Sequence, residues 1–600
     1  MDRYSKAFTL MVGLLALAVY WPGMQGPFLF DDYPSIVNNI AIHIHDIGSA
    51  SLLGALEGPK AGPLGRPISV LSFAFSHYFH GLDPFAFKAT NLLLHLFNGA
   101  LVFLLLIRLC GPWDASPRHQ PFATLLTAAI TALWLLHPIN VVPIIMPVQR
   151  MTLLAASFGL LTIIAHLHWL RSSGARSYAW LIAAWLVCWP LAMLSKETAL
   201  TIPFIALVIG LTTSRGRKTS ITTAALLVAS LAAVLAAALM LGTGWLERAY
   251  EARTFTLEQR MLTEARVLWY YAAQIVFPRF DRFGLFLDDF PLSNGLLDPT
   301  TTLLSIIGWV AAITVAIVLR KRIPLFSLGV GWFLAGHLLE STIVPLEIAF
   351  EHRNYLPSVG LLLAAAGLLD MLRKAVPPSS FRPVAMLLFA GLFLYCSAVT
   401  FMRSMHFSDG LRFAFMEVQY HPKSPRANLA AGTALMDAGY GAGGDFASQA
   451  IVYHLLEAAK LDPSHKIAYV YLLVLSCGTQ KQPDMEWIAE LESRLRYTPY
   501  SPQDKGLASR LGKLAINPSQ CLDHGTVHRL FLAGADSERA PAEVRASFLE
   551  HLGDYSLLVE GNLAQSRALL QRALTLAPGN AQLRHKLNGL NGYGRNTEAS

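Results

Sequence analysis

The chain has 600 residues, of which 54% are hydrophobic and only 14% charged, and its mean hydropathy is +0.44. A soluble protein usually carries about 25% charged residues, so this composition excludes an ordinary soluble enzyme and indicates a membrane protein. The formal net charge is +8, but the basic residues stand in short clusters between apolar runs. That arrangement excludes a continuous nucleic-acid-binding face and favours a role in membrane topology.

Apolar stretches of roughly the length that crosses a bilayer, about 20 residues, follow one another up to residue 402. The stretch around 68–80 is an additional candidate, and the first run is interpreted as a signal anchor rather than a cleaved signal peptide because further spans follow it. We predict about eleven spans, at residues 7–22, 87–108, 121–137, 150–170, 178–194, 199–213, 221–243, 300–319, 323–340, 355–372 and 383–402.

The positive-inside rule orients this array. If the N-terminus is cytoplasmic, the loops on its side all carry basic residues, including Arg108 and Arg118, Arg171 and Arg176, Arg215 to Lys218, Arg320 to Arg322, and Arg373, Lys374 and Arg382. The opposite side receives two long loops, 23–86 and 244–299, and an odd number of spans places the C-terminal part there too. An amphipathic helix on the membrane surface accounts for much of the aromatic and charged loop 244–299.

From about residue 403 the composition is that of a soluble helical protein. Two segments place an alanine five residues before a helix-ending proline, Ala458 before Pro463 and Ala573 before Pro578. Small residues at such positions permit close helix packing in tetratricopeptide repeats, although a generic helical domain is the alternative. Cys477 and Cys521 lie in this part and can pair if it is extracytoplasmic.

The predicted fold class is therefore all-α. It comprises a multi-span membrane domain over residues 1–402, a soluble tetratricopeptide-like domain over 403–592 and a flexible tail over 593–600.

Adjacent carboxylates, Asp31 and Asp32, follow the first predicted span and are the first candidates for chemistry. One can act as general base toward an acceptor hydroxyl while the other orients it, or both can hold a divalent metal. The structural alternative is a helix N-cap with an acidic neighbour. A second acidic pair, Asp288 and Asp289, is interpreted as structural, and His43 and His45 as ordinary loop histidines.

Polar and basic groups also gather at the outer ends of the predicted spans. They are Arg66, His137, Gln149, Arg150, Lys196, Glu197, Glu351, His352 and Arg353. A single charged group at a membrane edge usually reaches toward the headgroups. Together, however, cations on the side where the positive-inside rule predicts few favour a site for an anion such as a lipid phosphate. The sequence has no Walker phosphate loop, no His-Glu-x-x-His zinc motif and no Gly-x-Ser-x-Gly elbow.

These pieces resemble one known family. Phe30-Asp31-Asp32, Arg66-Pro-Ile-Ser, Gly81-Leu-Asp-Pro, Asn91-Leu-Leu-Leu-His95, Leu136-His-Pro138, Gln149-Arg150, Leu194-Ser-Lys-Glu197 and Phe350-Glu-His-Arg-Asn-Tyr-Leu-Pro-Ser358 occur in order. The series resembles the transmembrane, tetratricopeptide-repeat O-mannosyltransferases (the TMTC group) and their bacterial relatives in the GT-C glycosyltransferase superfamily. It covers most of residues 20–360, and a repeat domain follows in the expected place.

The resemblance implies an inverting transfer of a sugar from a polyprenyl-phosphate donor to a hydroxyl of a protein, such as a pilin or another envelope protein. It further implies a bacterial inner-membrane protein whose site and C-terminal domain are periplasmic. The catalytic carboxylate would be Asp31 or Asp32, with Asp31 slightly favoured. Arg66, Arg150, Lys196, His352 and Arg353 would bind the donor phosphate, and Glu197, Glu351, His137 and Gln149 would support them. The sequence identifies no cofactor, and a divalent metal at the aspartates stays an open alternative.

Two other classes of function remain. A non-enzymatic membrane scaffold would use the repeats to gather envelope partners, and a transporter of lipid-linked sugars would move the donor across the membrane. A transporter should carry polar residues through the membrane centre, whereas here they gather at one face. The partners expected are the lipid-linked donor, a protein acceptor and membrane lipid, with no nucleic acid.

Overall fold

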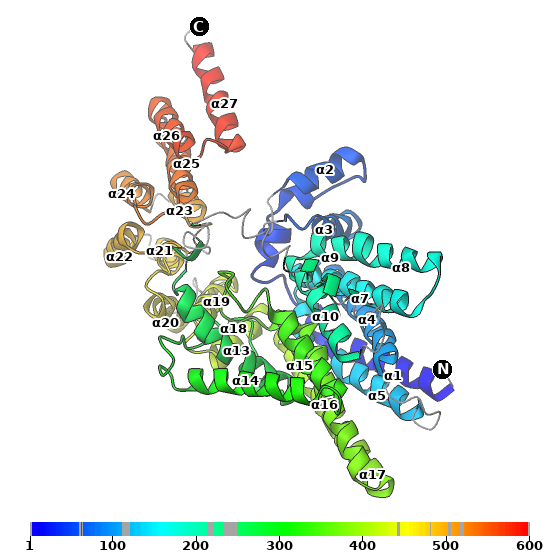
Figure 1. Cartoon of the computed structure of the whole chain (residues 1–600). Helices are drawn as coiled ribbons and strands as arrows, with labels where there is room; N and C mark the ends of the chain where they lie inside the picture. Colours follow the sequence, from blue (N-terminus) through cyan, green and yellow to red (C-terminus); the bar gives the residue numbers. More distant parts are fainter. Residues whose placement is uncertain are drawn as a thin grey trace. The chain divides into compact units, whose positions relative to one another are not determined.

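The computed structural model describes residues 3–213 apart from 59–61, 63 and 111–119, scattered positions between 221 and 251, and residues 253–597 apart from 441–444, 480–481, 502–503, 505 and 517–520. All regular structure in these residues is helical, without a strand, so the predicted all-α class is confirmed (Figure 1). The chain forms two compact units, Met1–Trp245 with Leu257–Phe413, and Leu246–Thr256 with Ala414–Ser600. The boundary predicted after residue 402 thus lies on the N-terminal side of the observed boundary after Phe413.

The first unit contains the helices of the predicted membrane domain. Its α-helices are α1 (Arg3–Met24), α2 (Ser49–Glu57), α3 (Pro67–His80), α4 (Pro84–Cys110), α5 (Gln120–Leu135), α6 (Val141–Ile145), α7 (Arg150–Arg171), α8 (Tyr178–Ile182), α9 (Trp189–Ser195), α10 (Ile202–Thr213), α13 (Leu257–Val276), α14 (Thr301–Leu319), α15 (Pro324–His337), α16 (Pro357–Ala375) and α17 (Pro378–His406). Short 3-10 and π segments join them: η1 (Tyr33–Val37), η2 (Ile40–Ile42), η4 (Pro138–Asn140), η5 (Pro147–Gln149), η6 (Ala175–Ser177), η7 (Ala183–Cys188), η8 (Glu197–Thr201), η9 (Phe280–Arg282) and η10 (Glu351–Asn354).

Each predicted span within the described residues coincides with one or more of these helices, and most of 221–243 lies outside them. Five helices are long and apolar enough to cross a membrane, or six if a pair of helices bent by 48° counts as one span. Pro138 explains that bend, because proline cannot donate the helical hydrogen bond and its ring displaces the preceding turn. Helix α15 has 14 residues, a length of about 21 Å against a hydrocarbon core of about 30 Å. The predicted eleven crossings therefore remain a prediction.

Helices α1 and α17 lie side by side at their C-terminal ends. The Gly23 N–H donates to Ser404 Oγ at 2.9 Å, and Ser404 Oγ donates to the Tyr20 carbonyl at 2.8 Å. A Cβ on Gly23 would lie 2.9 Å from the Ser404 carbonyl oxygen, so only glycine permits this approach. The loop after α1 and the exit of α17 are consequently at the same end of the unit.

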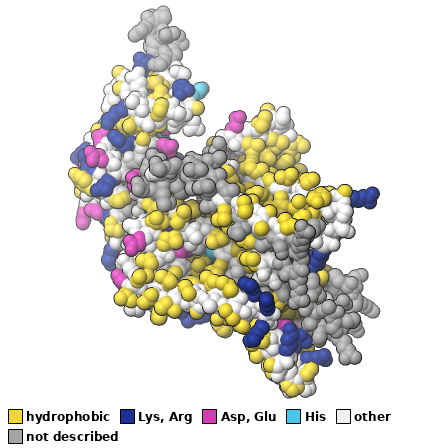
Figure 2. Space-filling view, in the orientation of Figure 1, with side chains coloured by type: hydrophobic (Ala, Val, Ile, Leu, Met, Phe, Trp, Pro, Cys, Tyr) yellow, Lys and Arg dark blue, Asp and Glu magenta, His cyan; other side chains and the backbone are white. Residues whose placement is uncertain are grey.

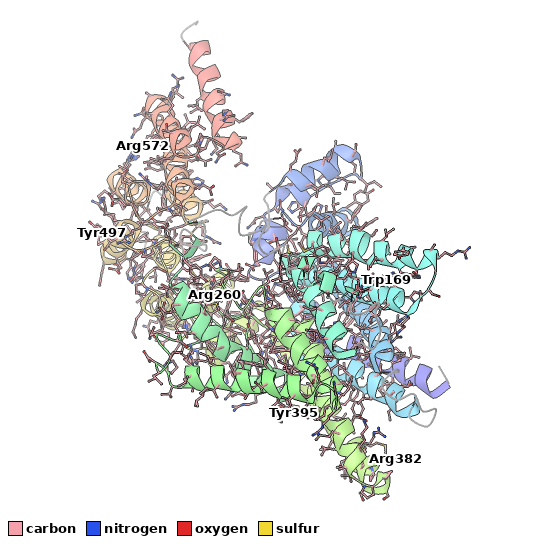
Figure 3. All side chains as sticks on the ribbon, in the orientation of Figure 1. Trp169, Arg260, Arg382, Tyr395, Tyr497 and Arg572 are labelled. Atoms are coloured by element: carbon pink, nitrogen blue, oxygen red, sulfur yellow. A yellow bond between two sulfur atoms is a disulfide. The ribbon has the colours of Figure 1, made fainter. Side chains whose placement is uncertain are left out.

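Basic side chains mark the other end of α17. The last turn of α16 carries Arg373 and Lys374, and Arg382 lies in the early part of α17. Figure 2 shows dark blue side chains gathered where α16 meets α17, and Figure 3 labels Arg382 toward one end of α17 and Tyr395 further along it. Helix α14, in contrast, exposes aliphatic side chains such as Leu304, Val310 and Val318, each at least 60% accessible, as expected of a helix that faces lipid.

Helices α15 and α16 pack with their backbones in contact and so fix the segment between them. A Cβ on Gly329 would lie 2.3 Å from the Gly360 carbonyl oxygen, and a Cβ on Gly360 would lie 2.6 Å from the Gly329 carbonyl oxygen. Any larger residue at either position would separate the helices. The start of α16 directly follows η10, which carries the His352-Arg353 pair.

The second unit is a series of helices: α18 (Gly410–Tyr420, shared with the first unit), α19 (Pro425–Asp437), α20 (Asp445–Leu461), α21 (Ile467–Thr479), α22 (Met485–Tyr497), α23 (Leu507–Ala515), α24 (His524–Ala535), α25 (Ala542–Leu558), α26 (Leu563–Leu576) and α27 (Ala581–Thr597). Ala458 and Ala573 are fully buried, as close packing of α20 and α26 requires. The repeat assignment itself remains a prediction. Helix α27 extends to Thr597, into the predicted tail.

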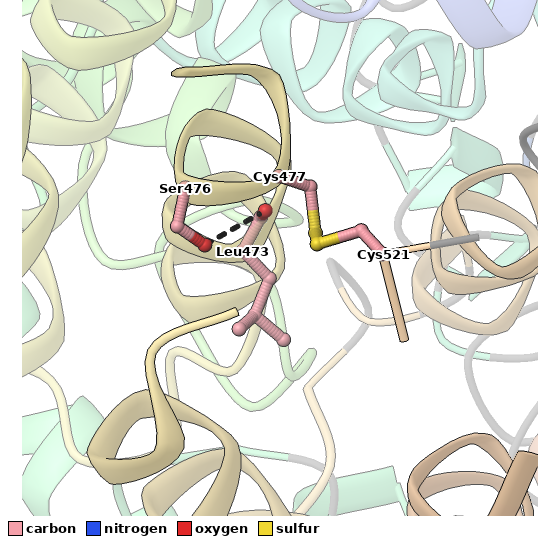
Figure 4. Close-up of a disulfide and its surroundings, with 4 residues drawn as sticks. All are labelled: Leu473, Ser476, Cys477 and Cys521. Atoms are coloured by element: carbon pink, nitrogen blue, oxygen red, sulfur yellow. Dashed lines mark hydrogen bonds between the residues drawn. A yellow bond between two sulfur atoms is a disulfide. The ribbon is translucent and has the colours of Figure 1, made fainter. Parts of the chain in front are cut away.

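A disulfide joins Cys477, near the end of α21, to Cys521, just before α24 (Figure 4). The two residues are 44 positions apart in sequence, and their Cα atoms are 5.5 Å apart. The pairing considered from the sequence is therefore present in the structure. Disulfides persist in oxidising compartments, which bears on the location of this unit.

Candidate functional site

A pocket in the first unit brings together three of the predicted phosphate-binding residues. Lys196, His352 and Arg353 line it, and so does Glu340, which the sequence analysis did not select. The other lining residues are Thr152, Ala155, Ala156, Thr198, Ala199, Thr201, Ile202, Ile205, Gly336, Tyr355, Leu356 and Pro357. The pocket thus combines a charged and hydroxyl-bearing part with an aliphatic wall from α7 and α10.

Lys196 follows α9, and a chain of hydrogen bonds orients its ammonium group. Lys196 Nζ donates to Thr152 Oγ1 at 3.1 Å, and the Thr152 hydroxyl donates to Gln149 Oε1 at 2.9 Å. The Glu340 carboxylate lies 3.5 Å from the same ammonium group. Gln149 is thus linked to Lys196 through Thr152, a residue that the sequence analysis did not select.

His352 and Arg353 come from η10. Arg353 donates to the carbonyls of Ile348 at 3.0 Å and Glu347 at 2.6 Å, and its guanidinium lies over the Phe350 ring. Within the described part of the chain, His352 Nδ1 and Arg353 Nε are buried nitrogens without a hydrogen-bond partner. Buried polar nitrogens are normally paired, so these two indicate a ligand that completes the site.

The electrostatics of the pocket are those of an anion site. Burial, together with the positive charges of Lys196, Arg353 and Arg66, holds the pKa of His352 well below its usual value of 6.5. Burial also lowers the pKa of Lys196; Glu340 opposes this effect, and Arg66 and Arg353 add to it. A negatively charged ligand would relieve the mutual repulsion of these cations.

Arg66 and Glu197, both selected from the sequence, form an ion pair next to Lys196 in the chain. Arg66 Nη2 and Nε lie 2.8 Å and 2.9 Å from Glu197 Oε2. Arg66 precedes α3 with a φ of 48°, a left-handed conformation that costs a non-glycine residue about 1–2 kcal/mol. Such strain clusters at functional sites, where the surrounding structure imposes it.

Asp31 and Asp32 have different surroundings. Asp32 is fully buried, and its carboxylate accepts hydrogen bonds from the Val148 N–H at 2.7 Å and the Leu29 N–H at 3.0 Å. Burial raises the pKa of Asp32 to about 7, against the opposing effects of those two N–H groups and of Lys88. Asp31 is exposed and follows Phe30, whose φ of 46° is also left-handed. Asp32 therefore anchors the loop to η5, and Asp31 is the accessible carboxylate; neither lines the pocket.

The placement of Arg150 differs from the sequence expectation. Its side chain is 1% exposed, and its guanidinium donates to Asn91 Oδ1, the Ser72 carbonyl, Ser76 Oγ and the Phe87 carbonyl at 2.7–3.0 Å. It also lies over the rings of Phe73 and Phe87. With its donors taken up by the protein, Arg150 joins α3, α4 and α7 rather than facing the pocket.

Two supporting residues also have other partners. Glu351 Oε2 lies 2.7 Å from Arg403 on α17, and Glu351 Oε1 accepts from the Gly284 N–H at 2.8 Å. His137 Nδ1 accepts from the Ile139 N–H, so its Nε2–H donates to the Ile275 carbonyl at 2.9 Å. Glu351 thus fixes η10 to α17, and His137 fixes its loop to α13.

Tyr355 forms part of the pocket wall, and hydrogen bonds to its hydroxyl and its carbonyl hold it in place. Asn98 donates to its hydroxyl at 3.1 Å, His95 Nδ1 lies 2.9 Å from the same oxygen, and Trp134 Nε1 donates to the Tyr355 carbonyl at 3.1 Å. His95 and Asn98 on α4 therefore hold the Tyr355 hydroxyl in place in the wall of the pocket. In the described residues, no group of three or more His, Cys, Asp or Glu side chains is arranged to hold a metal ion.

The sequence analysis missed Glu340, Thr152 and Arg403. Glu340 and Arg403 each stand as a lone charge at the end of an apolar run, and that signal could have marked both. Thr152 carries no such signal, because a threonine in an apolar helix is common and only its contact with Lys196 distinguishes it.

Comparison with known proteins finds relatives for about a third of the chain. The protein O-mannosyl-transferase TMTC4 of Homo sapiens is 29% identical over 207 residues, which cover 32% of this chain and 28% of the relative. Tmtc3 of Drosophila melanogaster is 28% identical over 216 residues, or 33% and 23% of the two chains. TMTC1 of Mus musculus is 30% identical over 224 residues, or 34% and 22%.

The chain therefore matches less than a third of the length of each of these relatives. Neither a family profile nor a solved structure matches the chain significantly. The matches support the relationship to the TMTC group and the GT-C superfamily that the ordered motifs indicate.

Proposed function

We propose that this chain, related over about a third of its length to the TMTC protein O-mannosyl-transferases, is a membrane glycosyltransferase that acts on proteins and uses a polyprenyl-phosphate-linked sugar. The observation that carries the proposal is the pocket in which Lys196, His352 and Arg353 converge next to an aliphatic wall. A phosphate with a lipid tail has the same two parts, because its headgroup needs cations and its chain needs apolar contact.

The residues divide the chemistry between them. When the bond between the sugar and the phosphate breaks, the phosphate leaves as an anion, and Lys196 and Arg353 stabilise its growing charge. The acceptor hydroxyl must lose a proton as the new bond forms, and an accessible carboxylate can take it. Asp31 suits that role because it is exposed, whereas both carboxylate oxygens of Asp32 bind backbone N–H groups.

The two ends of α17 support one orientation of the chain in the membrane. Its N-terminal part carries Arg382, which the positive-inside rule assigns to the cytoplasm. Its C-terminal part holds Arg403, which pairs with Glu351 of η10, and Ser404, which contacts the end of α1. If α17 crosses the membrane, η10 and the loop with Asp31 lie on the same side as the C-terminal end of α17.

The chain continues from α17 into the second unit, which carries the Cys477–Cys521 disulfide. A disulfide indicates an oxidising compartment and therefore the extracytoplasmic side. Two independent signals, basic residues at one end of α17 and a disulfide beyond its other end, support the same orientation. The helical second unit is then available to bind a protein acceptor on the side where the sugar is transferred.

The test uses the purified full chain in lipid nanodiscs, a short-chain polyprenyl-phosphate hexose with a radiolabelled sugar, and envelope protein from cells that lack the chain. Several hexoses are offered in parallel. We expect label to pass to protein, and Lys196→Met to reduce the rate by about 100-fold, the effect of losing one preorganised charge contact. Arg382→Met removes a cation from an exposed position and should leave the rate unchanged. Folded wild-type protein that transfers none of the sugars, or Lys196→Met with the wild-type rate, would contradict the proposal.

A further inference from the structure

Glu340 places a negative charge inside the pocket that the proposed function assigns to a phosphate. It follows the end of α15, is 7% exposed, and lines the pocket with Lys196, His352 and Arg353. Its carboxylate oxygen Oε1 lies 3.5 Å from Lys196 Nζ, and Arg353 also acts on it electrostatically. A carboxylate beside the cations of an anion site weakens the binding of an anion, so its presence requires an explanation.

The contact between Glu340 and Lys196 is long. At 3.5 Å it exceeds the 2.7–2.9 Å of a good charge-assisted hydrogen bond, whereas Thr152 lies closer to the ammonium group at 3.1 Å. A lysine ammonium has three N–H groups, and these two contacts account for two of them. A phosphate oxygen that entered the pocket could form the short bond that Glu340 does not form.

Glu340 cannot easily withdraw from the pocket, because Arg260 binds the backbone of the segment that carries it. The guanidinium of Arg260, on α13, donates to the carbonyls of Glu340 and Thr342, the latter at 2.9 Å. Arg260 is fully buried and forms an ion pair with Glu264 at 2.9 Å. The segment that carries Glu340 therefore stays close to Lys196 whether or not a ligand is bound.

We infer that Glu340 is a counter-anion that occupies Lys196 in the empty pocket and speeds release of the phosphate product. The inference rests on the proposed function. A lipid-linked sugar phosphate is a phosphodiester with one negative charge, whereas the lipid phosphate left after transfer carries up to two. Repulsion from a nearby carboxylate grows with the charge of the phosphate, so Glu340 disfavours the product more than the donor.

The test compares the purified full chain with its Glu340→Gln variant in two measurements. In the first, equilibrium binding of a short-chain polyprenyl phosphate should be about ten-fold tighter in Glu340→Gln, or 1.4 kcal/mol. In the second, a rapid first turnover should be followed by slower steady-state turnover, because product release becomes limiting. Glu258→Gln removes the same charge from an exposed position of α13 and should change neither measurement.

Polyprenyl phosphate that binds Glu340→Gln no more tightly than wild type, at an unchanged melting temperature, would overturn the inference. If Glu340→Gln does not fold, Glu340→Asp keeps the charge but withdraws it from Lys196, and should bind the product more tightly than wild type. A loss of the first turnover with unchanged product affinity would make Glu340 a proton acceptor instead and would also overturn the inference. If wild type itself binds no polyprenyl phosphate, the proposed function fails.

Discussion

The ion pair between Glu351 and Arg403 should be the most sensitive contact that holds η10 in place. The two side chains are 1% and 2% exposed, and their charged atoms are 2.7 Å apart. Removing one partner of a buried ion pair costs about 3–5 kcal/mol, because the other charge stays buried without compensation. Arg403 also donates to the Pro138 carbonyl and lies 4.2 Å from the centroid of the Phe283 ring, so its loss removes additional contacts.

The two single variants should differ in a defined order. Glu351→Gln keeps an oxygen that can accept from Gly284 or Arg403, so we expect a loss near the lower limit, about 3 kcal/mol. Arg403→Met leaves the Glu351 carboxylate buried without its guanidinium partner, so we expect a loss near the upper limit, about 5 kcal/mol. The double variant has no uncompensated charge, so it should be more stable than the sum of the single losses predicts.

The assay is reversible denaturant unfolding of the full chain in detergent, followed by tryptophan fluorescence. Asp281→Asn is the matched control, because it breaks the exposed Arg279–Asp281 pair and should leave the unfolding midpoint unchanged. Glu351→Gln with wild-type stability, or losses that add exactly in the double variant, would refute the reasoning. Either result would mean that the packing of α16 and α17 holds η10 without the ion pair.

Three other predictions concern single residues. Burial raises the pKa of Asp32 from 3.8 to about 7, so between these pH values the folded protein binds a proton that the unfolded chain has released. As the pH rises from about 4 to about 7, wild type should therefore lose stability relative to Asp32→Asn. Stability that changes equally with pH in both proteins would contradict this. In non-reducing buffer, Cys477→Ser should destabilise the second unit by about 2–4 kcal/mol, and its unfolding should no longer respond to reductant. Equal stability of wild type and Cys477→Ser without reductant would contradict a structural disulfide. Arg150→Lys should lower the melting temperature but leave the KM for the sugar donor unchanged in the folded fraction, because the Arg150 guanidinium donates its hydrogen bonds to groups of the protein itself. A rise in KM without a loss of stability would show instead that Arg150 binds the donor phosphate.

The sequence predicted the helices well because apolar runs and prolines define them locally. Each described span prediction falls on a helix, and Pro67, Pro324, Pro357 and Pro378 begin four of them, where a missing N–H costs nothing. The number of crossings could not be predicted as directly, because short helices such as α15 are apolar through burial in the protein as well as through contact with lipid.

Three of the residues selected from the sequence line one pocket. The positions of Lys196, His352 and Arg353 at the ends of apolar runs indicated a shared site, because span ends on one side of a membrane come together. Arg150 has the same local signal, yet its donors are directed at carbonyls of α3 and α4, which only the tertiary structure reveals. The pairing of Glu351 with Arg403 could not be predicted from the sequence, since the two residues are 52 positions apart.

The central claim, protein glycosylation that depends on the Lys196 pocket and the Asp31 carboxylate, is tested most directly in cells. Envelope proteins from cells that lack the chain are compared by intact mass after complementation with wild type, Lys196→Met, Asp31→Asn or Arg382→Met, at equal membrane levels. We predict a glycan mass with wild type and Arg382→Met and its loss with Lys196→Met and Asp31→Asn. A glycan that persists in both of those variants, or that is absent with wild type, would contradict the assignment.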